Sequence, residues 1–293
     1  MQDSTERPAL AIIGGRDAYK LLSRRHDAQR LDRIDTPFGA SQPIYIFRHD
    51  GAPYYFLSRH GETGYTISPS FVNYRANIYA LKELDVKHIV SWGGSAAINL
   101  KYLVGQHVIV NDLVDETKNR ESTFFRFRGL GLIRQSEVFC PMLRAVLRGA
   151  LLDLHLDFAD QGTYVCVEGP RLETAAEVRK YAAYGGDLVG MTLAPEAFLA
   201  KELEMCYAAA CYVVNYAEGV RERPVVSERL LGGLIPRSEK RRVEEAFGYL
   251  PKVLARIMGH LAKAKVVCTC QEAMLYYKKQ GRISDNWREW LNP

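Results

Sequence analysis

The chain has 293 residues, of which 47% are hydrophobic, and it carries a formal net charge of +5. A chain of this length and composition can bury a sizeable core, which excludes a disordered protein. The positive excess is small, so it favours a small anionic ligand over a nucleic-acid partner.

The sequence gives no sign of a membrane or secretory segment. Residues 1–8 are polar and lack the apolar core of a signal peptide. The uncharged run 205–217 is shorter than the roughly 20 residues that a membrane-spanning helix needs. Six cysteines scattered along the chain do not form a disulfide framework, which is typical of a reduced compartment. We therefore expect a cytoplasmic protein with neither a membrane nor a nucleic-acid partner.

Cys268 and Cys270 form the only close pair of cysteines. Such a pair is compatible with a disulfide, with half of a metal site, or with two ordinary thiols. Neither a second Cys-x-Cys pair nor a histidine lies nearby in the sequence. We therefore favour ordinary thiols and expect no metal site.

Taken in chain order, the first predicted strand is the apolar run 9–13, which ends in Gly14 and Gly15. A glycine-rich turn after a first strand often brings backbone N–H groups close to a phosphate. This turn matches neither of the common phosphate-binding patterns, so a plain turn is the alternative.

Residues 43–47 and 54–57 are spaced like two antiparallel strands around the turn at 50–51. The second strand leads into Arg59 and His60, whose side chains can donate charge-assisted hydrogen bonds to an anion. The alternative is an exposed pair without a ligand.

The remaining segments alternate between helical spacing and short apolar runs. Residues 115–131 are rich in charge and poor in core residues, which predicts a long loop, and such loops tend to be functional or to meet a partner subunit. Residues 221–241 are charged and rich in turns. The predicted helices are 72–84, 142–156, 174–184, 196–208 and 243–263. The predicted strands are 88–92, 108–110, 164–167 and 211–214.

The tail 266–293 holds aromatic residues among charges, which predicts a helical segment that packs on the rest of the domain or on another subunit. No linker, repeat or low-complexity segment divides the preceding residues. We therefore expect one α/β domain over residues 1–265, with a mixed central β-sheet flanked by helices.

Two of the predicted strands end abruptly in polar residues. Glu168 follows the strand 164–167, and Asn215 follows the strand 211–214. Open α/β sheets bind ligands where strand ends carry polar side chains. We therefore expect the ligand pocket to be built mainly from residues 162–219.

Several short motifs follow one another between Ile12 and Ala217. They are Ile12-Ile13-Gly14-Gly15, Asp35-Thr36-Pro37-Phe38-Gly39, Arg59-His60-Gly61, Asn73-Tyr74-Arg75-Ala76-Asn77, Glu168-Gly169-Pro170-Arg171, Gly190-Met191-Thr192, Pro195-Glu196 and Asn215. In this order they resemble the trimeric purine nucleoside phosphorylase and methylthioadenosine phosphorylase family. The resemblance implies reversible phosphorolysis of a purine nucleoside to the free base and pentose 1-phosphate. It also implies a homotrimer, or a hexamer built as a dimer of trimers, with inorganic phosphate as co-substrate and no metal or organic cofactor.

The resemblance also implies roles for individual residues. Met191 would lie under the sugar, and Phe124 and Phe125 would lie where relatives reach into a neighbouring subunit's site. Asn215, Glu173 and His60 would act in catalysis. The residues implied to bind phosphate are Arg16, Arg59, His60, Ser91, Trp92 and Thr192. Those implied to bind the nucleoside are Gly93, Gly94, Phe124, Phe125, Leu172, Glu173, Gly190, Met191 and Asn215.

The type of base can be inferred from hydrogen-bonding groups. An ionised carboxylate such as Glu173 only accepts hydrogen bonds, so it suits the N1–H of a 6-oxopurine. The Asn215 amide can donate to O6 and accept from N7–H. We therefore expect inosine, guanosine or 5′-methylthioinosine as substrate, with methylthioadenosine as the alternative.

Two residues depart from the family pattern. Arg16 stands where relatives carry a serine or threonine that binds phosphate, and Trp92 stands where they carry a small residue. The Trp92 indole would either fill the anion site or pack behind it. A non-catalytic relative that binds a nucleoside is therefore the alternative to an enzyme.

Overall fold

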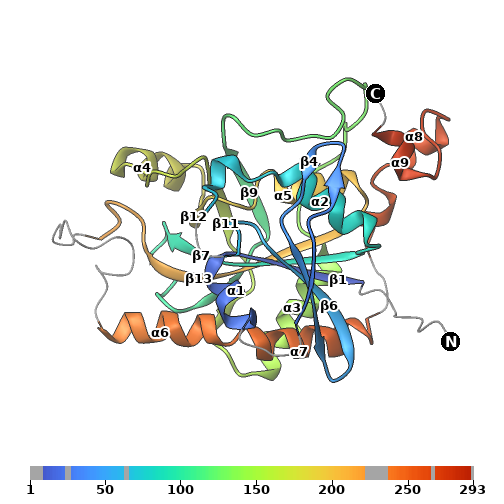
Figure 1. Ribbon diagram of the computed structural model, residues 1–293. Helices are drawn as coiled ribbons and strands as arrows, with labels where there is room; N and C mark the ends of the chain where they lie inside the picture. The colour runs from blue at the N-terminus through green and yellow to red at the C-terminus, as the bar shows by residue number, and fades with distance from the viewer. Residues whose placement is uncertain (1–8, 24–27, 63–65, 222–236, 265–267, 292–293) are drawn as a thin grey trace.

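A computed structural model describes residues 9–23, 28–62, 66–221, 237–264 and 268–291 of the chain (Figure 1). It confirms a single α/β domain with a mixed central sheet flanked by helices. In the described residues eleven strands join this sheet, and a two-stranded ribbon, β3 with β4, stands apart. The strands are β1 (Leu10–Gly14), β2 (Gln29–Leu31), β3 (Asp35–Thr36), β4 (Gly39–Ala40), β5 (Ile44–His49), β6 (Ala52–Ser58), β7 (His88–Ala97), β8 (His107–Ile109), β9 (Asp112–Glu116), β10 (Phe158–Ala159), β11 (Thr163–Val167), β12 (Leu188–Gly190) and β13 (Cys206–Tyr216).

The strand β7 is the centre of the sheet. It pairs in parallel with β1 on one side and with β13 on the other. Its last two residues, Ala96 and Ala97, pair with β12 in the antiparallel sense. β12 in turn carries β11 and then β9. Of the strands in the expected pocket region, β12 and β13 thus pair directly with β7, and β11 lies one strand further out.

The helices cover the two faces of the sheet (Figure 1). Helices α3, α6 and α7 lie against one face, and α2 and α5 pack together on the other. The helices are α1 (Arg16–Ser23), α2 (Tyr74–Glu83), α3 (Pro141–Asp153), α4 (Ala175–Ala183), α5 (Glu196–Glu202), α6 (Arg237–Gly248), α7 (Leu250–Leu261), α8 (Leu275–Lys279) and α9 (Trp287–Trp290). Short 3-10 turns span Pro69–Phe71 and Cys270–Glu272. No helix in the described residues is both long enough and apolar enough to cross a membrane.

The C-terminal helices α8 and α9 pack on their own chain. Tyr277 and Trp290 are buried in the same core cluster as α2 and α5. The Glu204 carboxylate accepts a hydrogen bond from the Met274 backbone N–H at 3.0 Å and forms an ion pair with Lys278 at 2.7 Å. These contacts hold the described part of the tail against the domain of the same chain.

Two expected helices differ from the observed elements. The helix expected over 196–208 ends at Glu202, and its last residues belong to β13, because Tyr207 and the alanines after it are buried within the sheet. The helix expected over 243–263 is two helices, since α6 ends at Gly248 and Pro251 lies in the first turn of α7. Proline lacks the N–H that a continuous helix would need there.

A candidate nucleoside and phosphate site

Two glycines of β7 are open to solvent although this strand lies in the middle of the sheet, and we call the space above them the cleft. Although β7 lies between β1 and β13, Gly94 is exposed and Gly93 is partly exposed. A Cβ atom placed on Gly93 would meet no heavy atom within 4 Å. Residues of a central strand are normally covered, so these two glycines mark the floor of an open site.

Arg59 lies at one end of this cleft, directly after β6. Its Nε and Nη2 atoms donate to the Glu196 carboxylate at 3.0 and 2.7 Å, and Nη2 also donates to the Ser91 hydroxyl at 3.0 Å. Arg59 and Glu196 are each only 2% exposed. Tyr207 donates a further hydrogen bond to Glu196 at 2.7 Å. These bonds use three of the five guanidinium N–H donors of Arg59 and leave out the two on Nη1.

His60 is buried beside Arg59 and faces the turn after β1. Its Nδ1 lies 2.9 Å from the Ile67 carbonyl oxygen, which fixes the ring. A Cβ atom on Gly15 would lie 3.8 Å from the His60 ring, so the turn that precedes α1 lies against it. Burial, followed by the positive charge of Arg59, lowers the pKa of His60 from 6.5 to about 4. The imidazole is therefore neutral at pH 7 in the absence of an anion.

The turn after β12 brings Gly190, Met191 and Thr192 to the cleft, where all three are partly exposed. Gly190 is required by packing, because a Cβ atom there would lie 2.0 Å from the Tyr164 hydroxyl. Burial raises the pKa of Tyr164, and hydrogen bonds with Thr192 oppose that effect. Tyr164 thus fits against the turn and helps to place Thr192.

Glu173 and Asn215 belong to two segments that pack against each other. Glu173 is buried just before α4, and this burial raises the pKa of its carboxyl group. The segment that follows Asn215 packs against the start of α4, since a Cβ atom on Gly219 would lie 2.7 Å from that of Ala175. Leu172, which is partly buried, precedes Glu173 in the same segment.

Only one of the two polar atoms of the Asn215 amide has a hydrogen-bond partner among the described residues. Its Nδ2 donates to the Tyr216 carbonyl at 3.0 Å, whereas its Oδ1 is buried without a hydrogen-bond partner among the described residues. An unpaired buried acceptor costs about 1–3 kcal/mol. A donor on a bound ligand would remove this cost.

A β-bulge in β13 sets the direction of Asn215. Val213 pairs with Ser95 of β7, and Asn215 pairs with the very next residue, so Val214 is extra. As a result Val213 and Tyr216 belong to the same core cluster although they are three residues apart. Regular alternation would place them on opposite faces of the strand.

Arg120 is the functional residue that sequence reasoning missed. Its side chain is 1% exposed and comes from the long loop after β9. Nη1 donates to the carbonyl oxygens of Met191 and Ala194 at 2.7 and 2.6 Å, and Nη2 donates to those of Val167 and Glu168 at 3.1 and 2.7 Å. One guanidinium group therefore joins the end of β11 to the turn after β12. The charge pattern of 115–131 indicated the loop but could not single out this residue.

The structure corrects the expectation for three aromatic side chains. The Trp92 indole packs beside His107 and Tyr212 in the core cluster of α3 and α7, so it lies behind the strand and not in the anion site. Phe124 and Phe125 are buried in the core of their own chain, which prevents them from reaching a neighbouring subunit. The Arg16 side chain lies outside the described part of the structure, which places only its backbone at the start of α1.

A separate surface hollow of about 670 Å³ lies between α4 and the residues that follow β7. Its lining includes Asn99, Arg179, Glu218 and Gly219, but neither Glu173 nor Asn215 and none of the charged side chains described above. We assign the ligand to the cleft above β7 because the buried charges and the unpaired amide oxygen gather there.

Comparison with known proteins shows the family of the chain. The model of the phosphorylase superfamily matches residues 10–232. A 6-oxopurine nucleoside phosphorylase from Pyrococcus furiosus is 38% identical over 239 residues, which cover 79% of this chain and 88% of the relative. The chain belongs to the nucleoside phosphorylase family.

Other members of the family differ in their named substrates. A probable S-methyl-5′-thioinosine phosphorylase from Methanothermobacter thermautotrophicus is 39% identical over 211 residues, covering 72% of both chains. The crystal structure of a methylthioadenosine phosphorylase from an antarctic soil metagenomic library superimposes with a TM-score of 0.81. It is 28% identical and covers 98% of this chain and 99% of its own. The relatives of this chain thus include enzymes named for 6-oxopurine substrates and enzymes named for a 6-aminopurine substrate.

Proposed function

We propose that this chain catalyses the phosphorolysis of a 6-oxopurine nucleoside to the free base and pentose 1-phosphate. The observation that carries the proposal is the pair Glu173 and Asn215, with an unpaired amide oxygen on Asn215. Glu173 would accept a hydrogen bond from N1–H, and Asn215 would donate to O6 and accept from N7–H. The relatives named 6-oxopurine nucleoside phosphorylases support this choice of base.

Phosphate would bind near His60, Thr192 and Arg59. The backbone N–H groups at the start of α1 lie beside His60 and favour an anion there. The neutral His60 ring, held through Nδ1 at the Ile67 carbonyl oxygen, would contact hydrogen phosphate. No metal or organic cofactor is part of this scheme.

In the proposed reaction a phosphate oxygen bonds to C1′ as the C1′–N9 bond breaks. The sugar passes through an oxocarbenium-like transition state whose positive charge the phosphate stabilises. The departing purine gains a proton at N7, and Asn215 accepts the resulting N7–H hydrogen bond. Positioning and electrostatics would supply the rate enhancement, since no enzyme nucleophile is needed.

The 5′ substituent distinguishes two forms of this proposal. Methylthioinosine is the second candidate substrate, because a relative with that named activity is 39% identical to this chain. The region expected to contact the 5′ group follows Val220, and its residues 222–236 lie outside the described part of the chain. We also propose that the chain assembles as a homotrimer, a suggestion supported by the exposed Phe127 and Leu132 in its long loop.

A phosphate-dependent assay tests the proposal with inosine, guanosine, methylthioinosine and methylthioadenosine. We expect cleavage of the 6-oxopurine substrates, and we expect Glu173→Gln to lower kcat/KM for them by about 10²-fold or more. Glu218→Gln is the matched control, because Glu218 is an exposed carboxylate close to Glu173. Cleavage of methylthioadenosine alone would refute the base assignment. Nucleoside binding by calorimetry without turnover would instead support the non-catalytic alternative.

A further inference from the structure

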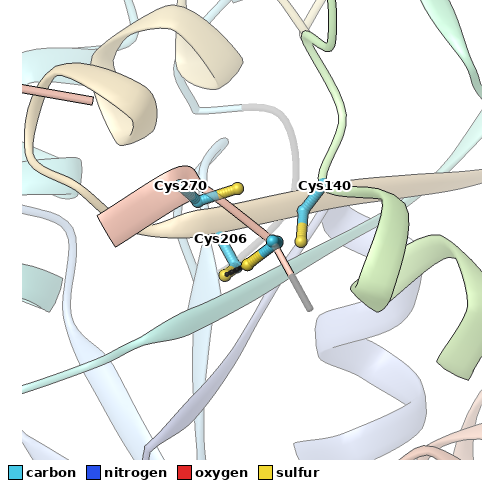
Figure 2. A group of neighbouring side chains, drawn as sticks. Cys140, Cys206 and Cys270 are labelled. Atoms are coloured by element: carbon cyan, nitrogen blue, oxygen red, sulfur yellow. Dashed lines mark hydrogen bonds between the residues drawn. The ribbon is translucent and has the colours of Figure 1, made fainter. Parts of the chain in front are cut away.

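Four cysteine thiols from distant parts of the chain meet at one point. Cys140 is the N-cap residue of α3, Cys206 opens β13, and Cys268 and Cys270 precede the tail helices. Their four Sγ atoms all lie within 4.8 Å of one another. Figure 2 shows the sulfur atoms of Cys140, Cys206 and Cys270 gathered between the start of α3, the strand β13 and the tail. Folding therefore brings Cys140 and Cys206, which are distant in the sequence, next to the pair Cys268 and Cys270.

Two of the four thiols are held by regular secondary structure. The Cys140 N–H donates to the Tyr207 carbonyl at 2.8 Å, which ties the start of α3 to the start of β13. The Cys206 N–H donates to the Lys87 carbonyl at 2.9 Å. Both side chains are buried, and these backbone hydrogen bonds hold their residues in place. Cys268 and Cys270 are partly exposed and close the cluster from outside.

The arrangement of the sulfur atoms matches tetrahedral coordination. Zinc–thiolate bonds of about 2.3 Å place the sulfur atoms of a tetrahedral site about 3.8 Å apart. The Sγ atoms of Cys206 and Cys268 are 3.6 Å apart, and no pair in the cluster exceeds 4.8 Å. A single ion at the centre can therefore reach all four ligands after small adjustments of the side chains.

Two of the four sulfur atoms lie beside positive charge. The Leu143 N–H, in the first turn of α3, donates to the Cys140 sulfur at 3.5 Å. The N-terminus of this helix adds a partial positive charge at the same point. The Lys201 ammonium group, which donates to the Glu137 carbonyl at 2.7 Å, is close enough to Cys270 to interact with it electrostatically. A disulfide carries no charge and would gain little from these contacts.

We propose that Cys140, Cys206, Cys268 and Cys270 bind one Zn²⁺ ion per chain as a tetrathiolate site. Binding releases the thiol protons to the solvent and leaves the oxidation state of sulfur unchanged. The ion fastens the tail to the sheet and to α3. The tail in turn holds the long loop, since Tyr277 accepts a hydrogen bond from the Leu132 N–H at 2.9 Å and Arg128 donates to the Trp290 carbonyl at 3.0 Å.

The test measures the zinc content of the full chain, purified with a reductant and without a chelator. Mass spectrometric metal analysis is expected to find about one zinc per chain, falling to below about 0.1 in the double variant Cys268→Ser/Cys270→Ser. Cys211→Ala is the matched control, because Cys211 is a buried cysteine outside the cluster, and it is expected to keep its zinc. Cobalt substitution is expected to give the visible and near-ultraviolet absorption bands of a tetrahedral tetrathiolate.

The double variant alters two partly exposed residues of the tail, and its circular dichroism spectrum checks that it is folded. Three results would overturn the proposal. The first is reduced, folded wild-type protein that contains no zinc and takes up none when Zn²⁺ is added. The second is zinc that the double variant retains. The third is two disulfide bonds among the four cysteines in protein purified without reductant and free of metal.

Discussion

The Arg59 guanidinium and the Glu196 carboxylate form a buried ion pair through two hydrogen bonds of 3.0 and 2.7 Å. Glu196 is the counter-charge that allows an arginine to remain inside the protein beside the proposed phosphate position. Removing one partner of such a pair leaves an uncompensated buried charge, which costs more than the pair itself contributes.

Glu196→Gln is therefore expected to lower the free energy of unfolding by about 3–5 kcal/mol. Millimolar phosphate should restore more stability to this variant than to the wild type, because the anion replaces the missing negative charge. Thermal melts with and without phosphate measure both effects. Glu244→Gln, in an exposed position on α6, serves as the control. Equal stabilisation of Glu196→Gln and wild type by phosphate would place the anion away from Arg59.

Arg120→Lys tests whether the guanidinium that bridges the two turns positions the site. A lysine keeps the charge but cannot serve four carbonyl oxygens at once. We expect kcat/KM to fall about 10²-fold, mainly through kcat, and Tm to fall by a few degrees. Arg126→Lys is the matched control, because Arg126 lies exposed in the same loop. Wild-type kinetics in Arg120→Lys would show that these hydrogen bonds are dispensable.

Gly190→Ala tests the fit between Tyr164 and the turn after β12. The added methyl group would overlap the Tyr164 hydroxyl, and the buried tyrosine ring has no room to move. We expect a destabilisation of about 1–3 kcal/mol and at least a tenfold loss of kcat/KM. Gly259→Ala, in helix α7 with open space around it, should instead stabilise the chain by about 0.5–1 kcal/mol. An active and stable Gly190→Ala enzyme would contradict the packing described here.

His60 should make the protein less stable in acid. Above pH 6.5 neither the folded nor the unfolded state protonates this ring, so its full contribution is present. As the pH falls from 6.5 to about 4, only the unfolded state takes up the proton, and folding loses up to about 3 kcal/mol. His60→Gln should remove this part of the pH dependence, whereas His155→Asn, at an exposed position, should not. Urea unfolding at several pH values provides the comparison, and identical pH curves for wild type and His60→Gln would refute the burial effect.

The base preference should follow the hydrogen-bonding groups at positions 173 and 215. In Glu173→Ser/Asn215→Asp, the aspartate can accept from the 6-amino group and N7–H, and the serine can donate to N1. The ratio of kcat/KM for methylthioadenosine to that for methylthioinosine is expected to rise by about 10²-fold or more. Asn215→Asp alone is the control, since Glu173 still faces the N1 lone pair. An unchanged ratio in the double variant would mean that other residues read the base.

The sequence was sufficient for elements whose residues carry local signals. The strands β5 and β6, for example, pair in the antiparallel sense around the turn at 50–51, as their spacing predicts. The sequence did not predict elements in which burial within the sheet outweighs the helix propensity of the residues. The alanines of β13 favour a helix in isolation, but they fit between the packed helices and the neighbouring strands only as part of the sheet.

Site features that depend on long-range contacts were not predictable from local patterns. Arg120 acts on carbonyl oxygens that lie about 50 and 70 residues further along the chain, and nothing near it marks that role. Whether the Trp92 indole fills the anion site or packs behind it depends on side-chain alternation along β7, and in the structure the indole faces away from the cleft. Similarly, Cys140 and Cys206 meet the Cys-x-Cys pair only in the folded chain.

The face of β13 from which the Asn215 side chain projects depends on the extra residue, Val214, in the backbone of the strand. A variant that keeps Asn215 but straightens the bulge would turn the amide to the opposite face of the strand, as though the residue itself had been replaced. If Asn215 reads the base as proposed, substrate choice would change through insertions and deletions near residue 214. Position-by-position comparison of side chains would miss such changes, so the residue count of this strand must be matched before base specificity is transferred between relatives.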